Sequence, residues 1–190
     1  MEEKISLARL YYPVTVLGPG SRAGIWLTGC DRNCPGCISP ELQRYDPGRE
    51  VPISAIAEMI ATIPGAVDGF TISGGEPFYR PAALNALTRA LERISDDILI
   101  FTGYTLQELR SAEDPDIDQV LGRCAALIDG PFERELAGGR GLRGSSNQRC
   151  HVFRHAERYR DIETQECALQ TIIYNDRLLT IGIPRGEKKA

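Results

Sequence analysis

The chain has 190 residues, of which 42% are hydrophobic and 25% are charged, and its formal net charge at pH 7 is −4. This composition is typical of a folded domain and excludes a disordered chain. No run approaches the ~20 apolar residues of a membrane span, which excludes a membrane protein, and the negative charge argues against a general binder of nucleic acid. Residues 1–4 lack the basic and then apolar layout of a signal peptide, so we expect a cytoplasmic protein.

The first half of the chain predicts strands and helices in alternation. Residues 23–28 form a short apolar run between glycines and predict a buried strand. Apolar residues at helical spacing predict a helix over 54–63, and residues 70–73 predict a second strand. Pro81 opens a further helix, on which one apolar stripe extends to Ile94.

The alternation continues beyond residue 95. Residues 98–101 are an uninterrupted apolar run and predict the most clearly buried strand. A capping box over 105–108 starts a short helix, which the acidic stretch at 114–116 breaks, and another helical turn is expected over 117–121. Residues 124–128 predict a fourth buried strand.

The chain closes with a predicted antiparallel hairpin. Residues 169–174 and 178–183 are strand-like and flank the turn dipeptide Asn175-Asp176. The four earlier strands, separated by helices, indicate an α/β fold with a parallel sheet and right-handed crossovers.

Four unusual sequences follow the four predicted strands of this sheet. They are Cys30 after the first strand, Gly-Gly-Glu-Pro at 74–77 after the second, Thr-Gly-Tyr at 102–104 after the third and Asp-Gly-Pro-Phe at 129–132 after the fourth. Parallel sheets carry their chemistry in the loops that leave the carboxyl ends of the strands. The sequence therefore predicts one site at this edge of the sheet.

Three of the six cysteines are close together, at Cys30, Cys34 and Cys37. Their spacing would suit one face of a helix, but Pro35-Gly36 breaks helices, so we expect a loop that wraps a ligand. Structural zinc takes four closed ligands, and an iron–sulfur cluster with three thiolates has one iron open to a substrate. Both metals remain open on the residues alone, although no fourth cysteine or histidine lies near Cys37.

The pattern Cys-x-x-x-Cys-x-x-Cys after a first strand, with Gly-Gly-Glu-Pro after a second, resembles the radical S-adenosylmethionine (SAM) superfamily. The resemblance implies a [4Fe–4S] cluster on Cys30, Cys34 and Cys37, whose fourth iron is chelated by SAM. It also implies reductive cleavage of SAM to methionine and a 5′-deoxyadenosyl radical, which abstracts a hydrogen atom.

A closer resemblance is to the small activating enzymes of glycyl-radical proteins, particularly the activase family of anaerobic ribonucleotide reductase. The motifs that carry it lie at 18–22, 102–104, 129–132 and 142–149, and the similarity runs over about residues 11–183. It implies a partial (β/α) barrel of radical SAM type, mainly a parallel sheet with a C-terminal β-hairpin. We expect a single domain over 1–190, with the cluster loop at 30–37 and the hairpin at about 169–183.

The same resemblance implies partners and binding residues. The partners would be a large glycyl-radical enzyme and a low-potential electron donor such as flavodoxin or ferredoxin. The residues expected to bind SAM are Gly36, Cys37, Ile38, Ser73, Gly74, Gly75, Glu76, Pro77, Tyr104, Asp129 and Arg143.

Two departures from the family pattern keep other functions open. The family commonly has an aromatic residue where this chain has Gly36, and an aromatic residue and an asparagine where it has Ile38 and Ser39. One alternative is therefore a radical SAM tailoring enzyme that acts on a small molecule or peptide. The other is a non-catalytic interaction module that carries an iron–sulfur cluster or zinc.

Overall fold

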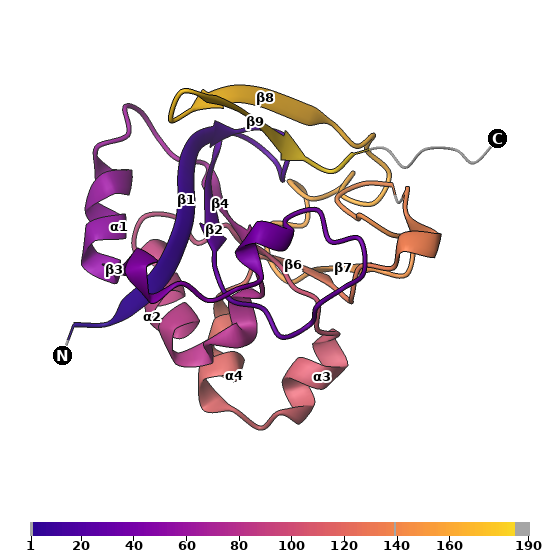
Figure 1. The fold of residues 1–190 in the computed structure, drawn as a ribbon, viewed down its shortest axis with the longest axis horizontal. Helices are drawn as coiled ribbons and strands as arrows, with labels where there is room; N and C mark the ends of the chain where they lie inside the picture. Colours follow the sequence, from indigo (N-terminus) through magenta and orange to yellow (C-terminus); the bar gives the residue numbers. More distant parts are fainter. Residues whose placement is uncertain (1, 139, 185–190) are drawn as a thin grey trace.

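A computed structural model describes residues 2–138 and 140–184, and it places a central sheet between helices and a C-terminal hairpin (Figure 1). The strands are β1 (Lys4–Val14), β2 (Arg22–Leu27), β3 (Glu50–Pro52), β4 (Gly69–Gly74), β5 (Ile98–Phe101), β6 (Ala126–Asp129), β7 (Arg149–Val152), β8 (Leu169–Tyr174) and β9 (Arg177–Gly182). The α-helices are α1 (Ile53–Ala61), α2 (Pro81–Glu92), α3 (Leu106–Ser111) and α4 (Pro115–Arg123). Short 3-10 helices lie at Pro40–Leu42, Pro47–Arg49, Pro77–Tyr79 and Arg134–Leu136.

The main sheet has seven strands in the order β3-β1-β2-β4-β5-β6-β7. The four central strands, β2, β4, β5 and β6, pair in parallel, and the outer strands pair antiparallel. The α/β class, the parallel sheet and the β8–β9 hairpin expected from the sequence are confirmed. The sheet is open at β3 and at β7, so a barrel is not confirmed.

The parallel strands are buried on both faces, because alternate side chains along a strand point to opposite sides. Ile25, Ile72 and Ile100 pack with helices α1, α2 and α4 in one cluster of the core. Trp26 packs with the hairpin residues on the opposite face, and Leu99 packs there with the segment that contains Tyr159. Burial on both faces explains the uninterrupted apolar run of β5, whose first three residues have no exposed surface.

Several parts of the fold differ from the expectation, among them the unpredicted strands β1, β3 and β7 and the start of α4. β1 was not predicted, because most of its residues are only half-buried and its pairing with β2 is irregular at two points, so it lacks a clean alternation. α4 begins at Pro115 rather than 117, because the Asp114 side chain caps it by accepting a hydrogen bond from Asp116 N at 2.8 Å. The acidic stretch thus starts one helix as well as ending another.

A buried ion pair holds the end of the sheet where the parallel strands begin. Arg22, the first residue of β2, has no exposed surface, and its guanidinium lies 3.1 Å from a carboxylate oxygen of Asp97. The guanidinium also donates to Thr71 Oγ1 at 2.8 Å. Arg158 reaches the other Asp97 oxygen at 2.6 Å, and the Tyr159 hydroxyl donates to Asp97. This network fastens the segment after β7 to β2, β4 and the residue that precedes β5.

Within the described residues, no helix has the length and apolar character that crossing a bilayer requires.

Candidate functional site

The three clustered cysteines lie in a loop without regular secondary structure that follows β2. The two ends of this loop are joined to each other, and the first end is also joined to β1. The Gly29 N–H donates to Leu42 O at 2.9 Å, and the hydroxyls of Ser6 and Thr28 are 2.5 Å apart. Between these anchors the chain is held by few main-chain bonds, one of which runs from Cys37 N to Cys34 O at 3.2 Å.

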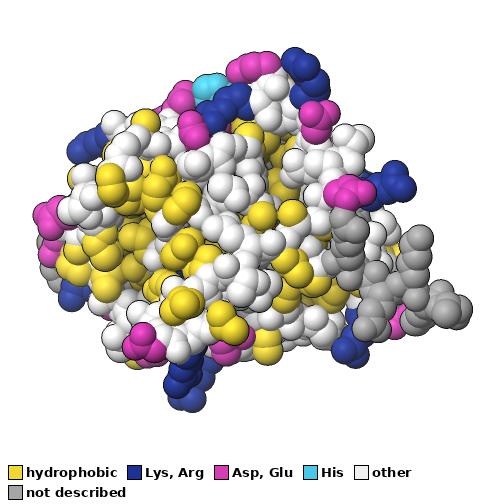
Figure 2. Space-filling view, turned by 90° about the horizontal axis from the view of Figure 1, so that it is seen from above, with side chains coloured by type: hydrophobic (Ala, Val, Ile, Leu, Met, Phe, Trp, Pro, Cys, Tyr) yellow, Lys and Arg dark blue, Asp and Glu magenta, His cyan; other side chains and the backbone are white. Residues whose placement is uncertain are grey.

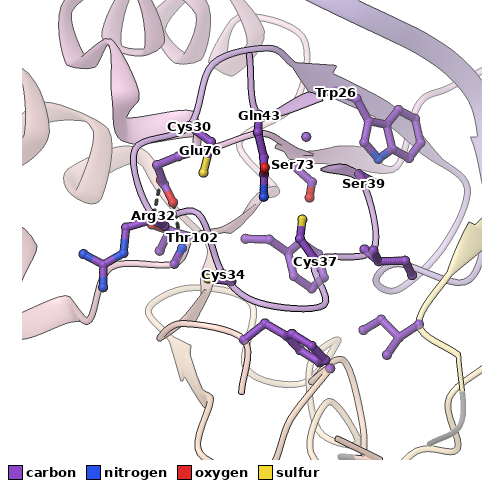
Figure 3. Close-up of a pocket in the computed structure, with 18 of the residues that line it drawn as sticks. Trp26, Cys30, Arg32, Cys34, Cys37, Ser39, Gln43, Ser73, Glu76 and Thr102 are labelled. Carbon is purple, nitrogen blue, oxygen red and sulfur yellow. Dashed lines mark hydrogen bonds between the residues drawn. The ribbon is translucent and has the colours of Figure 1, made fainter. Parts of the chain in front are cut away.

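A cavity of about 460 Å³ lies beside this loop, and Cys30, Cys34 and Cys37 all line it. Figure 3 shows the sulfur atoms of Cys30 and Cys37 pointing into the cavity from different sides. Among the residues that the structure describes, no three Cys, His, Asp or Glu side chains are close enough to one another to hold a metal ion. The cysteines therefore surround one space without converging on one point.

The Cys30 thiol is half-buried, and burial raises its pKa, while backbone N–H groups of Arg32 and Asn33 oppose the rise. A cysteine binds metal as the thiolate, so these two N–H groups are placed to favour the form that acts as a ligand. Both N–H groups belong to the cysteine loop, so the loop itself supplies the hydrogen bonds that lower the pKa of Cys30.

The cysteine loop is also braced from the loop after β5. The Tyr104 hydroxyl donates to the Asp31 carboxylate, and the Arg32 guanidinium lies 4.6 Å from the centre of the Tyr104 ring. Arg32 is 3.5 Å from Glu108 at the start of α3. Burial and the Asp31 carboxylate raise the pKa of Tyr104, so its hydroxyl stays protonated as a donor.

Two glycines at the end of β4 allow this part of the chain to lie directly against the cysteine loop. A Cβ on Gly74, whose φ is +118°, would be 2.3 Å from the backbone N and O of Leu27. A Cβ on Gly75 would be 2.2 Å from Gly29 O. Because the obstructing atoms are backbone, no side chain can be accommodated at either position. The glycines predicted to admit a cofactor are thus required already by the packing of these two loops.

Glu76 joins three of the four loops at this edge of the sheet. Its backbone N–H donates to Gly29 O at 2.7 Å. Its buried carboxylate accepts from Phe78 N at 2.9 Å, from Gly103 N at 2.7 Å and from the Thr102 hydroxyl at 2.8 Å. These bonds hold the loop after β4 against the cysteine loop and the loop after β5, and two of them are drawn in Figure 3.

Glu76 also makes stability depend on pH. Burial raises its pKa from the ordinary value of 4.5 to about 7, with the N–H and hydroxyl donors opposing the shift. The folded chain then holds this proton more tightly than the unfolded chain, so the stabilisation is complete below pH 4.5 and is lost as the pH rises through about 7. We expect the free energy of unfolding to fall over this window by on the order of 3 kcal/mol more than in a Glu76→Gln variant. Urea unfolding at a series of pH values measures this difference, and parallel curves for the two proteins would contradict it.

The residues predicted to bind a cofactor divide into two groups. One group lines the cavity, and it consists of Gly36, Cys37, Ile38, Ser73, Gly74, Gly75 and Glu76. The other group, Pro77, Tyr104, Asp129 and Arg143, does not line it. Asp129 instead accepts from Leu106 N at 2.6 Å, and Arg143 donates to the Arg140 carbonyl at 3.1 Å, so both support loops.

Several lining residues were not predicted. Trp26 lies on the face of β2 that turns toward the cavity, and Gln43 projects into it, as Figure 3 shows. Gln148 also lines the cavity, and its side chain joins two loops by donating to Gly130 O at 2.9 Å and accepting from Gly144 N at 2.8 Å. Gln148 could have been predicted, because it belongs to the motif at 142–149. Residues 179–184 could not have been predicted from local sequence, because only tertiary packing brings them to the cavity.

The donor set of the cavity suits an iron–sulfur cluster. Its lining offers three thiols from one short loop, and among the described lining residues none is a histidine. Thiolates are the soft ligands that such clusters take, and three of them leave one iron for another ligand. The chemistry of the donor set thus fits a cluster with one open position.

Comparison with known proteins agrees with this donor set. The family described as 4Fe-4S single cluster domain matches residues 16–151, so the class is that of proteins built around one such cluster. An anaerobic ribonucleoside-triphosphate reductase-activating protein of Salmonella typhi is 32% identical over 76% of this chain and 97% of its own length. Its counterpart in Vibrio cholerae is 33% identical over 75% of this chain and 96% of its own. The chain belongs to the family of anaerobic ribonucleoside-triphosphate reductase-activating proteins.

The relationship extends to a bacteriophage. The activating protein of phage T4 is 29% identical over 74% of this chain and 90% of its own length. The chain thus spans nearly the whole of these relatives.

Proposed function

We propose that this chain is a radical SAM oxidoreductase that generates a glycyl radical on an anaerobic ribonucleoside-triphosphate reductase. The observation that carries the proposal is the position of three cysteines around one cavity in a chain of the activating-protein family. Cys30, Cys34 and Cys37 would hold a [4Fe–4S] cluster. SAM would lie between the segments 36–38 and 73–76, which line the cavity.

When bound, the cluster and SAM would supply the one-electron chemistry that makes SAM a source of a radical able to abstract a hydrogen atom from glycine. The chain's own residues bind and orient. Glu76 and Tyr104 hold the cysteine loop in position, and the glycines at 74 and 75 allow it to pack closely. Trp26, Phe101 and Phe132 line the cavity with apolar surface, which excludes water from a reactive intermediate.

We also propose the finer features that the family assignment implies. The open sheet would be a partial (β/α) barrel within one domain over residues 1–190, its open side facing the partner. The electron would come from a low-potential donor such as flavodoxin or ferredoxin, since cluster potentials reach about −700 mV. A cytoplasmic location suits a site that depends on reduced thiols.

Anaerobic reconstitution tests the proposal. The purified protein is loaded with iron and sulfide, reduced in the presence of SAM, and assayed for 5′-deoxyadenosine. Purified reductase is then added, and electron paramagnetic resonance measures its glycyl radical. We expect both products. 5′-Deoxyadenosine without a glycyl radical would favour a tailoring enzyme for another substrate, and bound zinc without sulfide would favour a non-catalytic module.

A further inference from the structure

Strand β9 presents its open edge to the cavity, next to the inward-facing side chains Leu179 and Ile181 that pack with Trp26. The six consecutive residues 179–184 all line the cavity. Side chains alternate between the two faces of a strand, so a cavity against one face would be lined by every second residue. Lining by consecutive residues means that the backbone of β9 runs along the rim. Part of the hairpin, drawn in pale yellow, lies at one side of the cavity in Figure 3.

The register of the hairpin determines which backbone groups point outward from this edge. The two-residue turn Asn175-Asp176 closes the Tyr174–Arg177 pair, and the pairs along the hairpin alternate between hydrogen-bonded and non-hydrogen-bonded. Thr180 pairs with Thr171 in a non-hydrogen-bonded position, so the N–H and C=O of Thr180 point away from β8. Within the described part of the chain, no main-chain bond from a loop or another strand reaches Thr180.

The surface beside this edge is apolar. The cross-strand pair Ile173 and Leu178 is 75% and 79% exposed, and Ile38, on the cysteine loop, is 67% exposed. Figure 2, which looks onto the hairpin side of the molecule, shows hydrophobic side chains gathered on this surface. An exposed apolar surface of this kind is typical of a place where another polypeptide binds.

We propose that β9 binds an extended segment of the partner polypeptide by strand addition, and that this pairing guides the reacting residue into the cavity; the inference rests on the proposed function. An extended peptide satisfies an open strand edge through main-chain hydrogen bonds, and it places alternate side chains on the flanking surfaces. The edge at Thr180 supplies the donor and the acceptor for such pairing. Ile173, Leu178 and Ile38 supply the apolar surface outside it.

Two proline variants test the pairing. Thr180→Pro removes the outward N–H of the β9 edge and leaves the bonds within the hairpin intact. Thr171→Pro removes the equivalent N–H from the β8 edge, which does not line the cavity, and it is a matched control because the two threonines are directly paired. We expect Thr180→Pro to weaken the affinity for purified reductase roughly five- to tenfold, the effect of about one hydrogen bond, and Thr171→Pro to leave it unchanged. Equal affinities for both variants and the unaltered chain would overturn the proposal.

Hydrogen exchange gives a readout that needs no variant. In the complex with reductase, the amide of Thr180 is expected to exchange more slowly than in the chain alone, and the amide of Thr171 is expected to keep its rate. Protection of Thr180 in the chain alone at high concentration would instead indicate pairing with a second copy and would overturn the proposal. Both measurements read binding, so they remain valid if SAM cleavage, and with it the proposed function, fails.

Discussion

Replacing Cys37 by serine is expected to reduce the formation of 5′-deoxyadenosine by more than about a hundredfold. Loss of a group that merely supports a metal ligand already costs about 10–100-fold, so loss of a ligand costs more. Serine keeps the size of the side chain and removes the soft thiolate that iron requires. The loop offers no replacement, because no histidine lies among the described residues that line the cavity. The assay is anaerobic turnover with reduced protein and SAM, together with iron and sulfide analysis.

Cys167→Ser is the matched control for this substitution. Cys167 lies outside the cavity, and its thiol is 3.3 Å from the Gly141 carbonyl, to which a serine hydroxyl can also donate. This variant is expected to keep the iron content and the turnover of the unaltered chain. If Cys37→Ser had the same turnover as the unaltered chain, Cys37 would not be a ligand of the cluster. If both variants lost turnover to the same extent, the loss would reflect a general effect on folding.

Arg22→Met is expected to lower the free energy of unfolding by about 3–5 kcal/mol. The arginine has no exposed surface, and removing one partner of a buried pair leaves the other charge in a poorly hydrated place. Asp97 would keep Arg158 and Tyr159, but the Thr71 hydroxyl and the main-chain carbonyls of Phe70 and Asp97 would each lose one donor. Urea or thermal unfolding of the purified protein measures the change.

An exposed pair provides the comparison. Arg89 lies 2.8 Å from Glu3, and both side chains are about half exposed. Because solvent screens such a pair, it contributes only about 0–1 kcal/mol to the free energy of unfolding. Arg89→Met is therefore expected to change the free energy of unfolding by less than about 1 kcal/mol. If Arg22→Met lowered the free energy of unfolding no more than Arg89→Met, the buried network around Asp97 would not stabilise the fold as described.

Sequence patterns predicted the parts of the fold that depend on local signals. The bounds of β5 agree with the predicted strand at 98–101, because its residues are buried on both faces and form an unbroken apolar run. Thr105 and Glu108 form the predicted capping box at the start of α3. β1 escaped prediction because its half-buried residues and irregular pairing give no periodic pattern.

In the candidate site, too, local sequence signals predicted some features and missed those that depend on long-range packing. The three cysteines were predicted to hold a cluster, and that stays a prediction: all three line one cavity because they lie on one short loop, but within the described residues they do not converge on one point. Tyr104, Asp129 and Arg143 lie on the predicted loops, but their side chains turn to neighbouring backbone and loop groups instead of the cavity. Neither side-chain direction nor the arrival of β9 at the rim is encoded in local spacing, since both result from long-range packing.

Strand β2 separates a buried ion pair that stabilises the fold from the loop that carries the cysteines. The strand has the Arg22 ion pair at its first residue, is about 20 Å long for six extended residues, and ends three residues before Cys30. Substitutions that far apart, without shared partners, have additive effects. Substitutions in the cysteine loop are therefore expected to leave the contribution of the Arg22 ion pair to stability unchanged. A designer could replace this loop to change the reaction while keeping the free energy of unfolding that the ion pair supplies.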